Sequence, residues 1–342
     1  MKKTPLHTIY EQQKTFFDSG KTLHYSFRLA ALLRLEDALN TYEDALIKAL
    51  NEDLKKSAFE SYSAEIGLIK SEIRFAKRRL KKWMRPRKQR DVLINFPSKN
   101  YHVPIPYGLS LIIGPWNYPV QLCLNPLIGG IAAGNTVLLK PSEWAPNVAE
   151  VLQRMIAEFF NPAHISVLTG DETLGAELVE LDVDHIFFTG STQVGRLIAQ
   201  SAGSRLIPCT LELGGKSPCI VDQTADLKIT ARRIAWGKFM NAGQTCVAPD
   251  YVLVDERVES ELLVRLKDAI TEFYGADAST SPDYPRIVSD KHYNRLVNLF
   301  EEKSPPDSSV SEKGAMLYMG GETKAEERYI SPTILTDLGL NH

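Results

Sequence analysis

The 342-residue sequence lacks the features that mark several large classes of protein. Its four cysteines are irregularly spaced and form no C-x-x-C pair, which argues against a disulfide framework or a zinc site. No apolar run is long enough to cross a bilayer, and none follows the basic first residues as in a signal peptide. The net charge of −2 provides no bulk attraction to nucleic acid or anionic membranes. We therefore expect a cytoplasmic protein with reduced thiols and no metal, nucleic-acid or membrane partner.

One stretch departs from this charge balance. Residues 74–90 contain ten Lys or Arg and no acid. They form either a patch for nucleic acid or a membrane, which Trp83 would suit, or the solvated face of a helix that ends near Pro86. We favour the solvated face, because the rest of the chain cancels this charge.

The first part of the chain is predicted to be helical. Apolar residues recur at spacings of three and four in two segments, which is typical of helices with one buried face. The first stripe consists of Leu32, Leu35, Leu39, Tyr42, Leu46 and Leu50. The second, within a helix over 63–83, consists of Ile66, Ile69, Ile73, Ala76 and Leu80.

The middle of the chain alternates short apolar segments with helix-like segments. The expected strands are 109–113, 136–140, 165–169, 185–189 and 209–213, with helices at 122–133, 148–160, 174–181 and 194–202 between them. This alternation is typical of a parallel sheet covered by helices on both faces. The alternation resumes with strands at 217–221 and 251–255 and helices at 225–240 and 259–273.

The sequence thus predicts an α/β fold with two domains. Residues 1–214 comprise a helical N-terminus and a doubly wound, parallel-sheet, dinucleotide-binding domain, with an extended bridging segment at about 92–106. Residues 215–342 form a second, catalytic α/β domain. A polar segment at 304–313 is expected to be an exposed loop.

Glycine-rich and charged residues follow two of the expected strands. The run from Gly190 to Gly195 leads into a helix, where free N–H groups could bind a pyrophosphate. A P-loop is rejected because Arg196 stands where Lys is needed, but a turn that merely allows close packing is equally compatible. Lys140 and Glu143 could hydrogen-bond ribose hydroxyls, and Glu143 would disfavour a 2′-phosphate; the alternative is a surface ion pair.

Three further residues carry groups suited to catalysis. Cys246 is surrounded in the sequence by small and polar residues, which suggests an accessible thiol. Cys209 and Cys219 lie in apolar strand sequence, as core residues do. Glu212 is a carboxylate within apolar strand text, either paired or poised for proton transfer. Asn117 offers an amide at a strand end, as an oxyanion donor would, or is a turn residue.

Taken together, five blocks resemble the aldehyde dehydrogenase superfamily, and within it the short, class 3 type. They are IIGPWNYP (112–119), GNTVLLKPSE (134–143), FFTGSTQVGR (187–196), LELGGKSP (211–218) and GQTCVAPDYVLV (243–254). The resemblance extends from the first helix to RYISPTIL (328–335). It implies NAD-dependent oxidation, with NADP as the alternative cofactor, of a medium-chain aliphatic or aromatic aldehyde to its carboxylate.

The resemblance also implies roles for individual residues. Cys246 matches the nucleophile, Glu212 the general base and Asn117 the oxyanion-holding amide. Lys140 and Glu143 match contacts to the adenosine ribose. The other implied cofactor-binding residues are Gly190, Ser191, Thr192, Val194, Gly195, Gly214 and Trp116.

The end of the sequence departs from the family's pattern. In that family an E-E-I-F-G-P block follows, with a Glu that binds the nicotinamide ribose, and then more catalytic domain with a strand used in oligomer assembly. This sequence instead reads TDLGLNH and ends. We therefore expect a C-terminally truncated member with an incomplete catalytic domain, poor activity and no regular oligomer, whereas full-length relatives are homo-oligomers. The alternative to an enzyme is a catalytically silent, NAD-binding remnant.

Overall fold

The computed structural model describes residues 5–90, 93–301 and 316–338 of the chain. These fall into two compact units. The first comprises residues 1–49 and 62–213, and the second residues 50–61 and 214–342. The short segment 50–61 thus belongs to the second unit, which the sequence did not indicate. The loop expected at 304–313 lies outside the described residues.

The first unit is built on a five-stranded parallel sheet. Its strands are β3 (Leu109–Ile113), β4 (Thr136–Lys140), β5 (Ile165–Val167), β6 (His185–Thr189) and β7 (Cys209–Glu212). Their spatial order is β5-β4-β3-β6-β7, so the chain builds outward from β3 in one direction and then, from β6, in the other. Ligands of such sheets bind beyond the carboxyl ends of the strands where the order reverses, here between β3 and β6. The predicted doubly wound sheet is confirmed.

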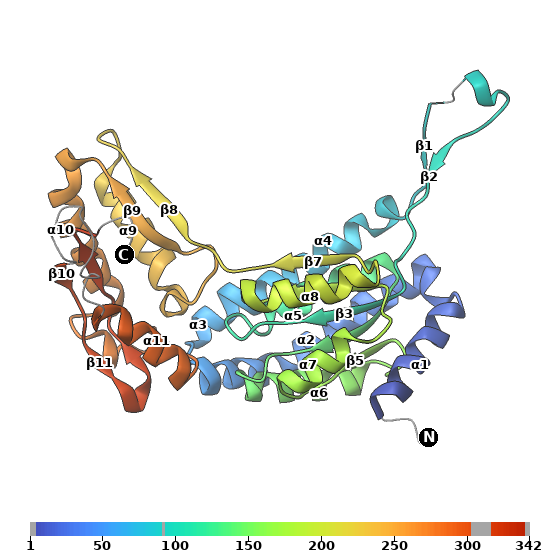
Figure 1. The fold of residues 1–342 in the computed structure, drawn as a ribbon, viewed down its shortest axis with the longest axis horizontal. Coiled ribbons are helices and arrows are strands. Elements are labelled where there is room, and N and C mark those ends of the chain that lie inside the picture. Colours follow the sequence, from blue (N-terminus) through green and yellow to red (C-terminus); the bar gives the residue numbers. More distant parts are fainter. Residues whose placement is uncertain (1–4, 91–92, 302–315, 339–342) are drawn as a thin grey trace. The chain divides into compact units, whose positions relative to one another are not determined.

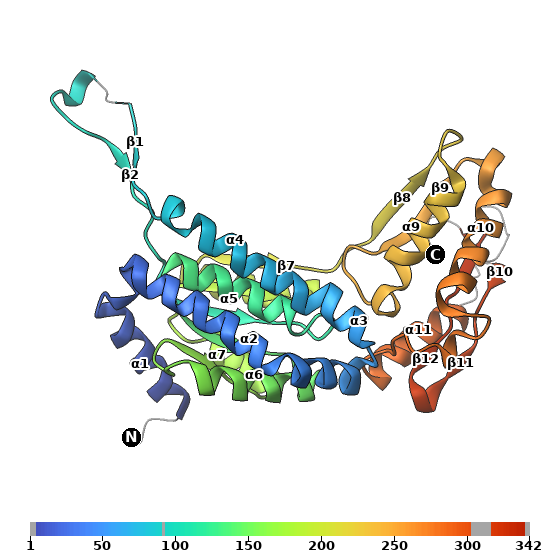
Figure 2. The ribbon, with the colours of Figure 1, turned by 180° about the vertical axis from the view of Figure 1, so that it is seen from behind.

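Helices cover both faces of this sheet (Figures 1 and 2). They are α1 (Pro5–Asp18), α5 (Gln121–Ala133), α6 (Pro146–Phe159), α7 (Glu172–Val179) and α8 (Thr192–Ser204). On one face, Leu178 of α7, Ile198 of α8 and Leu6 of α1 pack in one apolar cluster with Leu109 and Leu111 of β3. Figure 1 shows α7 and α8 in front of the sheet, and Figure 2 shows α5 on the opposite face.

Two long helices add a further layer beside α5 in Figure 2. They are α2 (Tyr25–Leu54) and α4 (Gly67–Trp83), with a 3₁₀ turn η1 (Lys21–Leu23), a short helix α3 (Ala58–Ser61) and a π-helical turn η2 (Tyr62–Ile66) before or between them. Both predicted apolar stripes are confirmed as buried, except that Tyr42 is only half-buried. The basic residues of 74–90 lie on the solvent side of α4 and in the segment after it, which agrees with the solvated-face interpretation.

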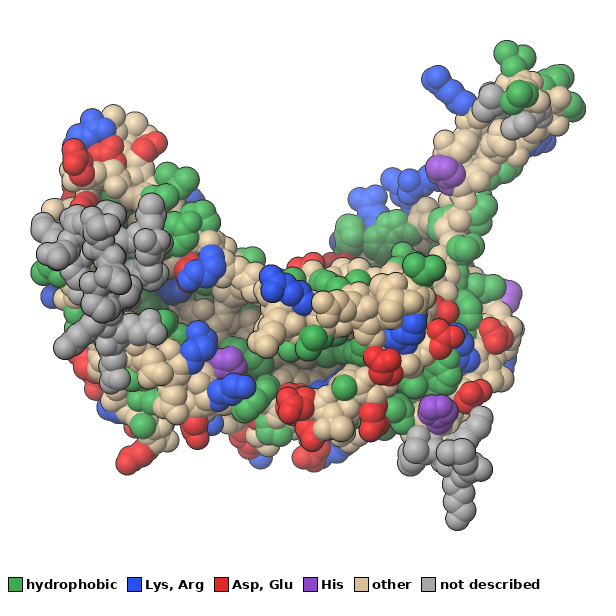
Figure 3. Space-filling view, viewed as in Figure 1, with side chains coloured by type: hydrophobic (Ala, Val, Ile, Leu, Met, Phe, Trp, Pro, Cys, Tyr) green, Lys and Arg blue, Asp and Glu red, His purple; other side chains and the backbone are tan. Residues whose placement is uncertain are grey.

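A β-hairpin follows α4. Strand β1 (Arg87–Lys88) pairs antiparallel with β2 (Tyr101–His102), and a 3₁₀ turn η3 (Leu93–Asn95) lies between them. The segment expected to be extended at about 92–106 therefore contains the second strand of this hairpin, and the first strand precedes it. The tip exposes apolar side chains, seen in Figure 3: Leu93, Ile94 and Phe96 are each at least 79% exposed.

The second unit repeats the strand and helix pattern on a smaller scale. Parallel strands β8 (Ser217–Val221) and β9 (Pro249–Val254) are joined through α9 (Leu227–Phe239) and η4 (Met240–Gly243), and α10 (Glu256–Tyr274) packs on α9. The remaining elements are η5 (Ala278–Thr280), α11 (Asp290–Glu301), β10 (Met316–Met319) paired with β13 (Ile334–Thr336), and β11 (Thr323–Lys324) paired with β12 (Tyr329–Ile330) around η6 (Ala325–Glu327). Among the described residues, no helix is long and apolar enough to cross a membrane.

Candidate active site

Asn117 lies in the loop that joins the end of β3 to α5. The loop begins at Gly114, whose N–H donates to the carbonyl oxygen of Lys140 at 2.9 Å and so ties the ends of β3 and β4 together. Gly114 has no room for a side chain, because a Cβ there would lie 2.2 Å from Sγ of Cys123. Asn117 is half-buried, and Tyr118 after it is buried. The structure thus places the predicted amide at the carboxyl edge of the central strand.

The glycine-rich run occupies the neighbouring edge, at the end of β6. Ser191 is the N-cap of α8, and its hydroxyl accepts from the N–H of Val194 at 3.3 Å. The N–H of Gly190 donates to the carbonyl oxygen of Glu212 at 3.0 Å. A Cβ at Gly195 would lie 2.6 Å from Cδ2 of Leu213, so this glycine allows close packing of α8 on the strand. The close-packing interpretation therefore holds for Gly195, and the helix N-terminus predicted to face an anion is also present.

Lys140 and Glu143 are brought together at the end of β4. Nζ of Lys140 donates to Oε2 of Glu143 at 2.9 Å and to the carbonyl oxygen of Pro141 at 3.3 Å. The Lys140 side chain is only 4% exposed and that of Glu143 is 36% exposed, so the pair joins a buried ammonium group to a carboxylate at the surface. Glu143 also borders a cavity of about 250 Å³. This cavity lies between the segment after β4 and the residues after β5, Thr169 and Gly170.

Glu212 is the last residue of β7, opposite Thr189 of β6. The strand expected here from the sequence is present, and it ends at Glu212, whose side chain is exposed. Asn117, Lys140, Gly190 and Glu212 therefore all stand at the carboxyl ends of strands of one parallel sheet.

Cys246 belongs to the second unit and follows an unusual turn. Asn241, Ala242 and Gly243 have positive φ angles of 54°, 51° and 78°. Side chains rarely adopt such angles, and non-glycine residues in this region store strain of roughly 1–3 kcal/mol each unless neighbouring contacts hold them. The chain then reaches Cys246, which is exposed. The accessible thiol expected from the sequence is present.

Gln244 holds this turn in place. Its Nε2 donates to the carbonyl oxygen of Asn241 at 3.1 Å and to that of Arg286 at 3.0 Å. Its Oε1 accepts from the backbone N–H of Val288 at 3.0 Å. In return, Nδ2 of Asn241 donates to the carbonyl oxygen of Gln244 at 3.3 Å. One amide side chain thus joins the turn before Cys246 to a segment more than 40 residues away.

Glycine and charged residues surround the other side of the Cys246 loop. A Cβ at Gly215 would lie 2.2 Å from the carbonyl oxygen of Cys246, so only glycine fits where this backbone passes the Cys246 loop. Asp250 pairs with Lys216 and lies 4.0 Å from Nζ of Lys238. Burial lowers the pKa of Lys238, an effect that Asp250 opposes.

The four thiols differ in their surroundings. Cys123 is fully buried, and burial, reinforced by the charge of Glu65, raises its pKa to about 12. Burial also raises the pKa of Cys219. Cys209 is half-buried, and Cys246 is the exposed member of the set. Because the thiolate is the nucleophilic form, the raised pKa values of Cys123 and Cys219 argue against either as a nucleophile.

The structure brings the predicted residues together in two groups. Asn117, Lys140, Glu143, Glu212 and the Gly190–Gly195 run share the sheet edge of the first unit, and Cys246 lies in the second. Trp116 precedes Asn117 in its loop, and Gly214 follows β7.

Two residues that contact these loops were not predicted from the sequence. The sequence marks Gln244 only by its place near Cys246. Glu65, which accepts hydrogen bonds at the start of α5, is marked as an acid on the inward side of an apolar stripe.

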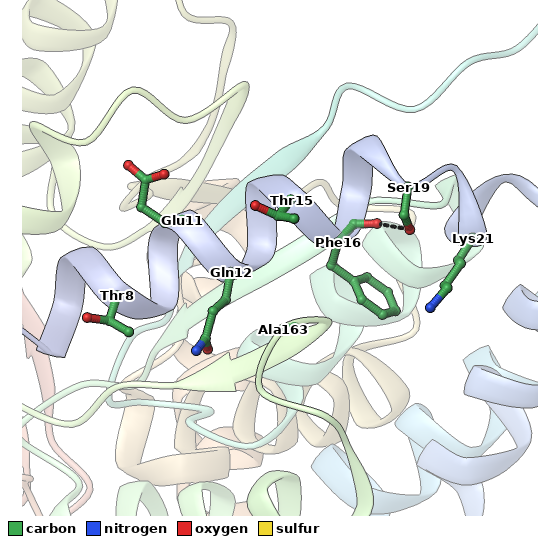
Figure 4. Close-up of a pocket in the computed structure, with 8 residues that line it drawn as sticks. All are labelled: Thr8, Glu11, Gln12, Thr15, Phe16, Ser19, Lys21 and Ala163. Atoms are coloured by element: carbon green, nitrogen blue, oxygen red, sulfur yellow. Dashed lines mark hydrogen bonds between the residues drawn. The ribbon is translucent and has the colours of Figure 1, made fainter.

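Two other hollows lie away from these residues. One, of about 540 Å³, is lined by Ser71, Arg74, Lys77 and Arg78 on α4. The other, of about 460 Å³, runs along α1, with Phe16 and Gln12 beside Ala163 (Figure 4). Among the described residues, no cluster of three or more His, Cys, Asp or Glu could hold a metal ion.

Known proteins resemble this chain over most of its length. The aldehyde dehydrogenase family profile matches residues 2–341. The chain is 45% identical over 326 residues to the 4,4′-diaponeurosporen-aldehyde dehydrogenase of Staphylococcus aureus, covering 95% of this chain and 69% of that protein. It is 39% identical over 333 residues to the dimeric NADP-preferring aldehyde dehydrogenase of Mus musculus, covering 97% and 71%. A solved structure described as the substrate-bound state of Staphylococcus aureus AldH matches with a TM-score of 0.93 and 43% identity, covering 99% and 72%.

These relatives are longer than the chain, which spans between 64% and 71% of the length of the curated proteins compared. The match nevertheless covers nearly all of this chain and extends to the fold. The chain therefore belongs to the aldehyde dehydrogenase family, whose enzymes are NAD(P)-dependent oxidoreductases.

Proposed function

We propose that this chain oxidises an aldehyde to a carboxylate through a covalent intermediate on Cys246. The observation that carries the proposal is the exposed thiol of Cys246 at the end of a strained turn that Gln244 holds in place. A strained and tethered loop is a common way to present a nucleophile. The family relationship supports the same assignment.

The residues of the chain divide the reaction between them. The Cys246 thiolate attacks the aldehyde carbon, and the oxyanion that forms accepts hydrogen bonds from the Asn117 amide and the backbone N–H of Cys246. When bound, the nicotinamide of NAD supplies the hydride acceptor for this adduct. The product is a thioester on Cys246. Glu212 then removes a proton from water, which attacks the thioester and releases the carboxylate and the free thiol. An enzyme that reduces acyl thioesters or acyl phosphates needs no base to activate water. A general base at Glu212 therefore favours aldehyde oxidation over that reaction.

The first unit fits a dinucleotide. The sheet order reverses between β3 and β6, and α8 begins directly at this edge, so its first N–H groups and the positive end of its dipole suit a pyrophosphate. Lys140 and Glu143 would contact the adenosine ribose, and the cavity of about 250 Å³ beside Glu143 would take the adenine. The carboxylate of Glu143 would repel a 2′-phosphate, so we propose NAD as the preferred cofactor. Trp116, Gly214 and the Gly190–Gly195 run would complete the site.

The substrate is proposed to be a medium-chain aliphatic or aromatic aldehyde. The proposal follows the class 3 resemblance, and the 45% identical relative is itself named for an aldehyde, 4,4′-diaponeurosporen-aldehyde. We further propose a cytoplasmic location, which the four free cysteines support.

The proposal is tested by NADH formation from NAD with hexanal or benzaldehyde. We expect the wild-type chain to form NADH, and Cys246→Ser to lower the rate by at least about 1000-fold, because the hydroxyl is a far weaker nucleophile. Cys209→Ser, a matched change at the half-buried thiol of β7, should keep the wild-type rate. Absence of NADH formation by the wild type, or normal turnover by Cys246→Ser, would contradict the proposal.

A further inference from the structure

The start of α5, directly after the Asn117 loop, is capped by a side chain from a distant part of the first unit. Oε2 of Glu65 accepts hydrogen bonds from the N–H groups of Val120 at 2.9 Å and Gln121 at 3.0 Å. Glu65 is fully buried, although charged residues are almost never buried without partners. Val120, the N-cap residue, supplies no side-chain cap of its own. The Glu65 carboxylate, 55 residues away in the sequence, therefore caps α5.

Hydrogen bonding and the helix dipole both favour a fixed position of the Glu65 carboxylate at the start of α5. The first N–H groups of a helix have no partner within the helix, and the helix dipole places partial positive charge there. A buried carboxylate satisfies two of these donors with charge-assisted hydrogen bonds, which are stronger than neutral ones. Releasing it would leave two donors of a buried helix end without these bonds.

The local structure around Glu65 is specialised for this contact. Glu65 lies in the π-helical turn η2 (Tyr62–Ile66), and π turns are rare and frequently occur at functional sites. Gly67, directly after it, has no room for a side chain, since a Cβ there would lie 2.9 Å from the carbonyl oxygen of Tyr62. The widened turn and the glycine hold Glu65 on the inward side of the helix.

The cap completes a clamp on the loop that carries Asn117. At the loop's first end, the N–H of Gly114 is bonded to the carbonyl oxygen of Lys140 at 2.9 Å. At its second end, the N–H groups of Val120 and Gln121 are bonded to Glu65. The segment between these anchors is five residues long (115–119), and Asn117 is its middle residue. Both ends of the loop are therefore fixed by hydrogen bonds, and Tyr118 within it is buried.

We propose that Glu65 is a positioning residue for the oxyanion-holding amide of Asn117. This positioning role rests on the proposed function, in which Asn117 stabilises the oxyanion on the Cys246 adduct. Glu65 does not touch substrate or cofactor in this account; it fixes the end of the loop from which the Asn117 side chain projects. An oxyanion donor is useful only when it is held in place before the charge develops.

A double-mutant cycle tests the coupling between the two residues. Asn117→Ala should lower kcat by about 100-fold or more, as loss of an oxyanion donor does. Glu65→Ala should lower kcat by at least about tenfold in the wild-type background, because a misplacement of about 1 Å can cost 100-fold. In the Asn117→Ala background the same change should cost less than about twofold, since no amide remains to be positioned. KM for NAD should stay within about twofold throughout, because the Lys140 and α8 contacts are unaltered.

Controls separate positioning from a general loss of stability. Glu65→Gln keeps one acceptor oxygen and should recover most of kcat. Asp255→Ala removes a cap of comparable type, because Asp255 accepts from the N–H of Arg257 at 3.0 Å at the start of α10, and it should lower stability while sparing kcat. If Glu65→Ala does not yield folded protein, Glu65→Asp, which shortens the reach of the carboxylate, enters the same cycle. Equal losses of kcat in both backgrounds, or no loss in the wild-type background, would overturn the proposal.

Amide hydrogen exchange provides a readout that is independent of catalysis. The N–H groups of Val120 and Gln121 should exchange faster in Glu65→Ala than in the wild type, with Glu65→Gln between them. If the wild-type chain forms no NADH, the proposed function fails, and the anchoring role of Glu65 is still decided by this exchange. Unchanged protection of the two amides in Glu65→Ala would overturn it.

Discussion

Removal of the Gln244 side chain should uncouple the Cys246 loop from the rest of the second unit. In Gln244→Ala the carbonyl oxygens of Asn241 and Arg286 lose their amide donor, and the N–H of Val288 loses its acceptor. Each intramolecular hydrogen bond contributes roughly 1 kcal/mol net, and a buried donor left without a partner costs about 1–3 kcal/mol. Val288 is only 4% exposed, so its N–H falls in the second class. The expected loss of unfolding free energy is therefore about 3–5 kcal/mol for the second unit.

The catalytic effect should be larger than the loss of stability alone explains. Asn241 and Ala242 adopt left-handed angles that only surrounding contacts maintain, so the untethered turn should relax toward ordinary angles. Cys246 lies four residues after Ala242, and a shift of its sulfur by about 1 Å can cost 100-fold in rate. We expect kcat for NADH formation to fall by about 10- to 100-fold at temperatures where the variant is folded.

The matched control is another glutamine with backbone acceptors. Nε2 of Gln13, on α1, donates to the carbonyl oxygens of Val137 and Pro162, both at 3.0 Å. Gln13→Ala should destabilise the first unit and leave kcat within about threefold of the wild type. Steady-state NADH formation and circular dichroism on both variants make the comparison. A folded Gln244→Ala chain with wild-type kcat would refute the tether argument.

Four further outcomes are expected. Limited iodoacetamide labelling with peptide mapping should modify Cys246 first, and earlier labelling of any other thiol would argue against the nucleophile assignment. Glu212→Gln should give a stopped-flow burst of NADH followed by a stall, because hydrolysis of the thioester needs the base; full turnover would mean that another group activates water. Glu143→Gln should weaken NAD binding about tenfold and narrow the preference over NADP, measured by calorimetry, and an unchanged ratio would remove Glu143 from the ribose site. Burial, reinforced by Arg34, lowers the pKa of His164 to about 4; the unfolded chain, with a His pKa near 6.5, then binds more protons, so stability should fall by up to about 3 kcal/mol as pH drops from about 6.5 to 4, and urea unfolding of His164→Gln should lack this slope.

Much of the first unit could be predicted because its signals are local. Each strand of the sheet is a short apolar run, and each following helix repeats its apolar residues at a helical period, so the order of elements followed from the text. Asn117, Lys140 and Gly190 could likewise be placed, since residues that directly follow parallel strands share one edge of a sheet.

Contacts between distant segments could not be predicted. Glu65 meets α5 across 55 residues, and Gln244 meets Arg286 across 42. Neither partner has a sequence feature that specifies the other. The left-handed backbone angles of Asn241 and Ala242 could not be predicted either, because only Gly243 is a residue type that indicates such a conformation.

The central claim is that the acyl group of the substrate is carried by Cys246. The most direct measurement is peptide-resolved mass spectrometry of Glu212→Gln, quenched in acid shortly after mixing with NAD and benzaldehyde. The account predicts a benzoyl group on the peptide that contains Cys246, in an amount that matches the NADH formed, and none when Cys246→Ser is added. NADH formation without this adduct, or the adduct on Cys209 or Cys219, would contradict it.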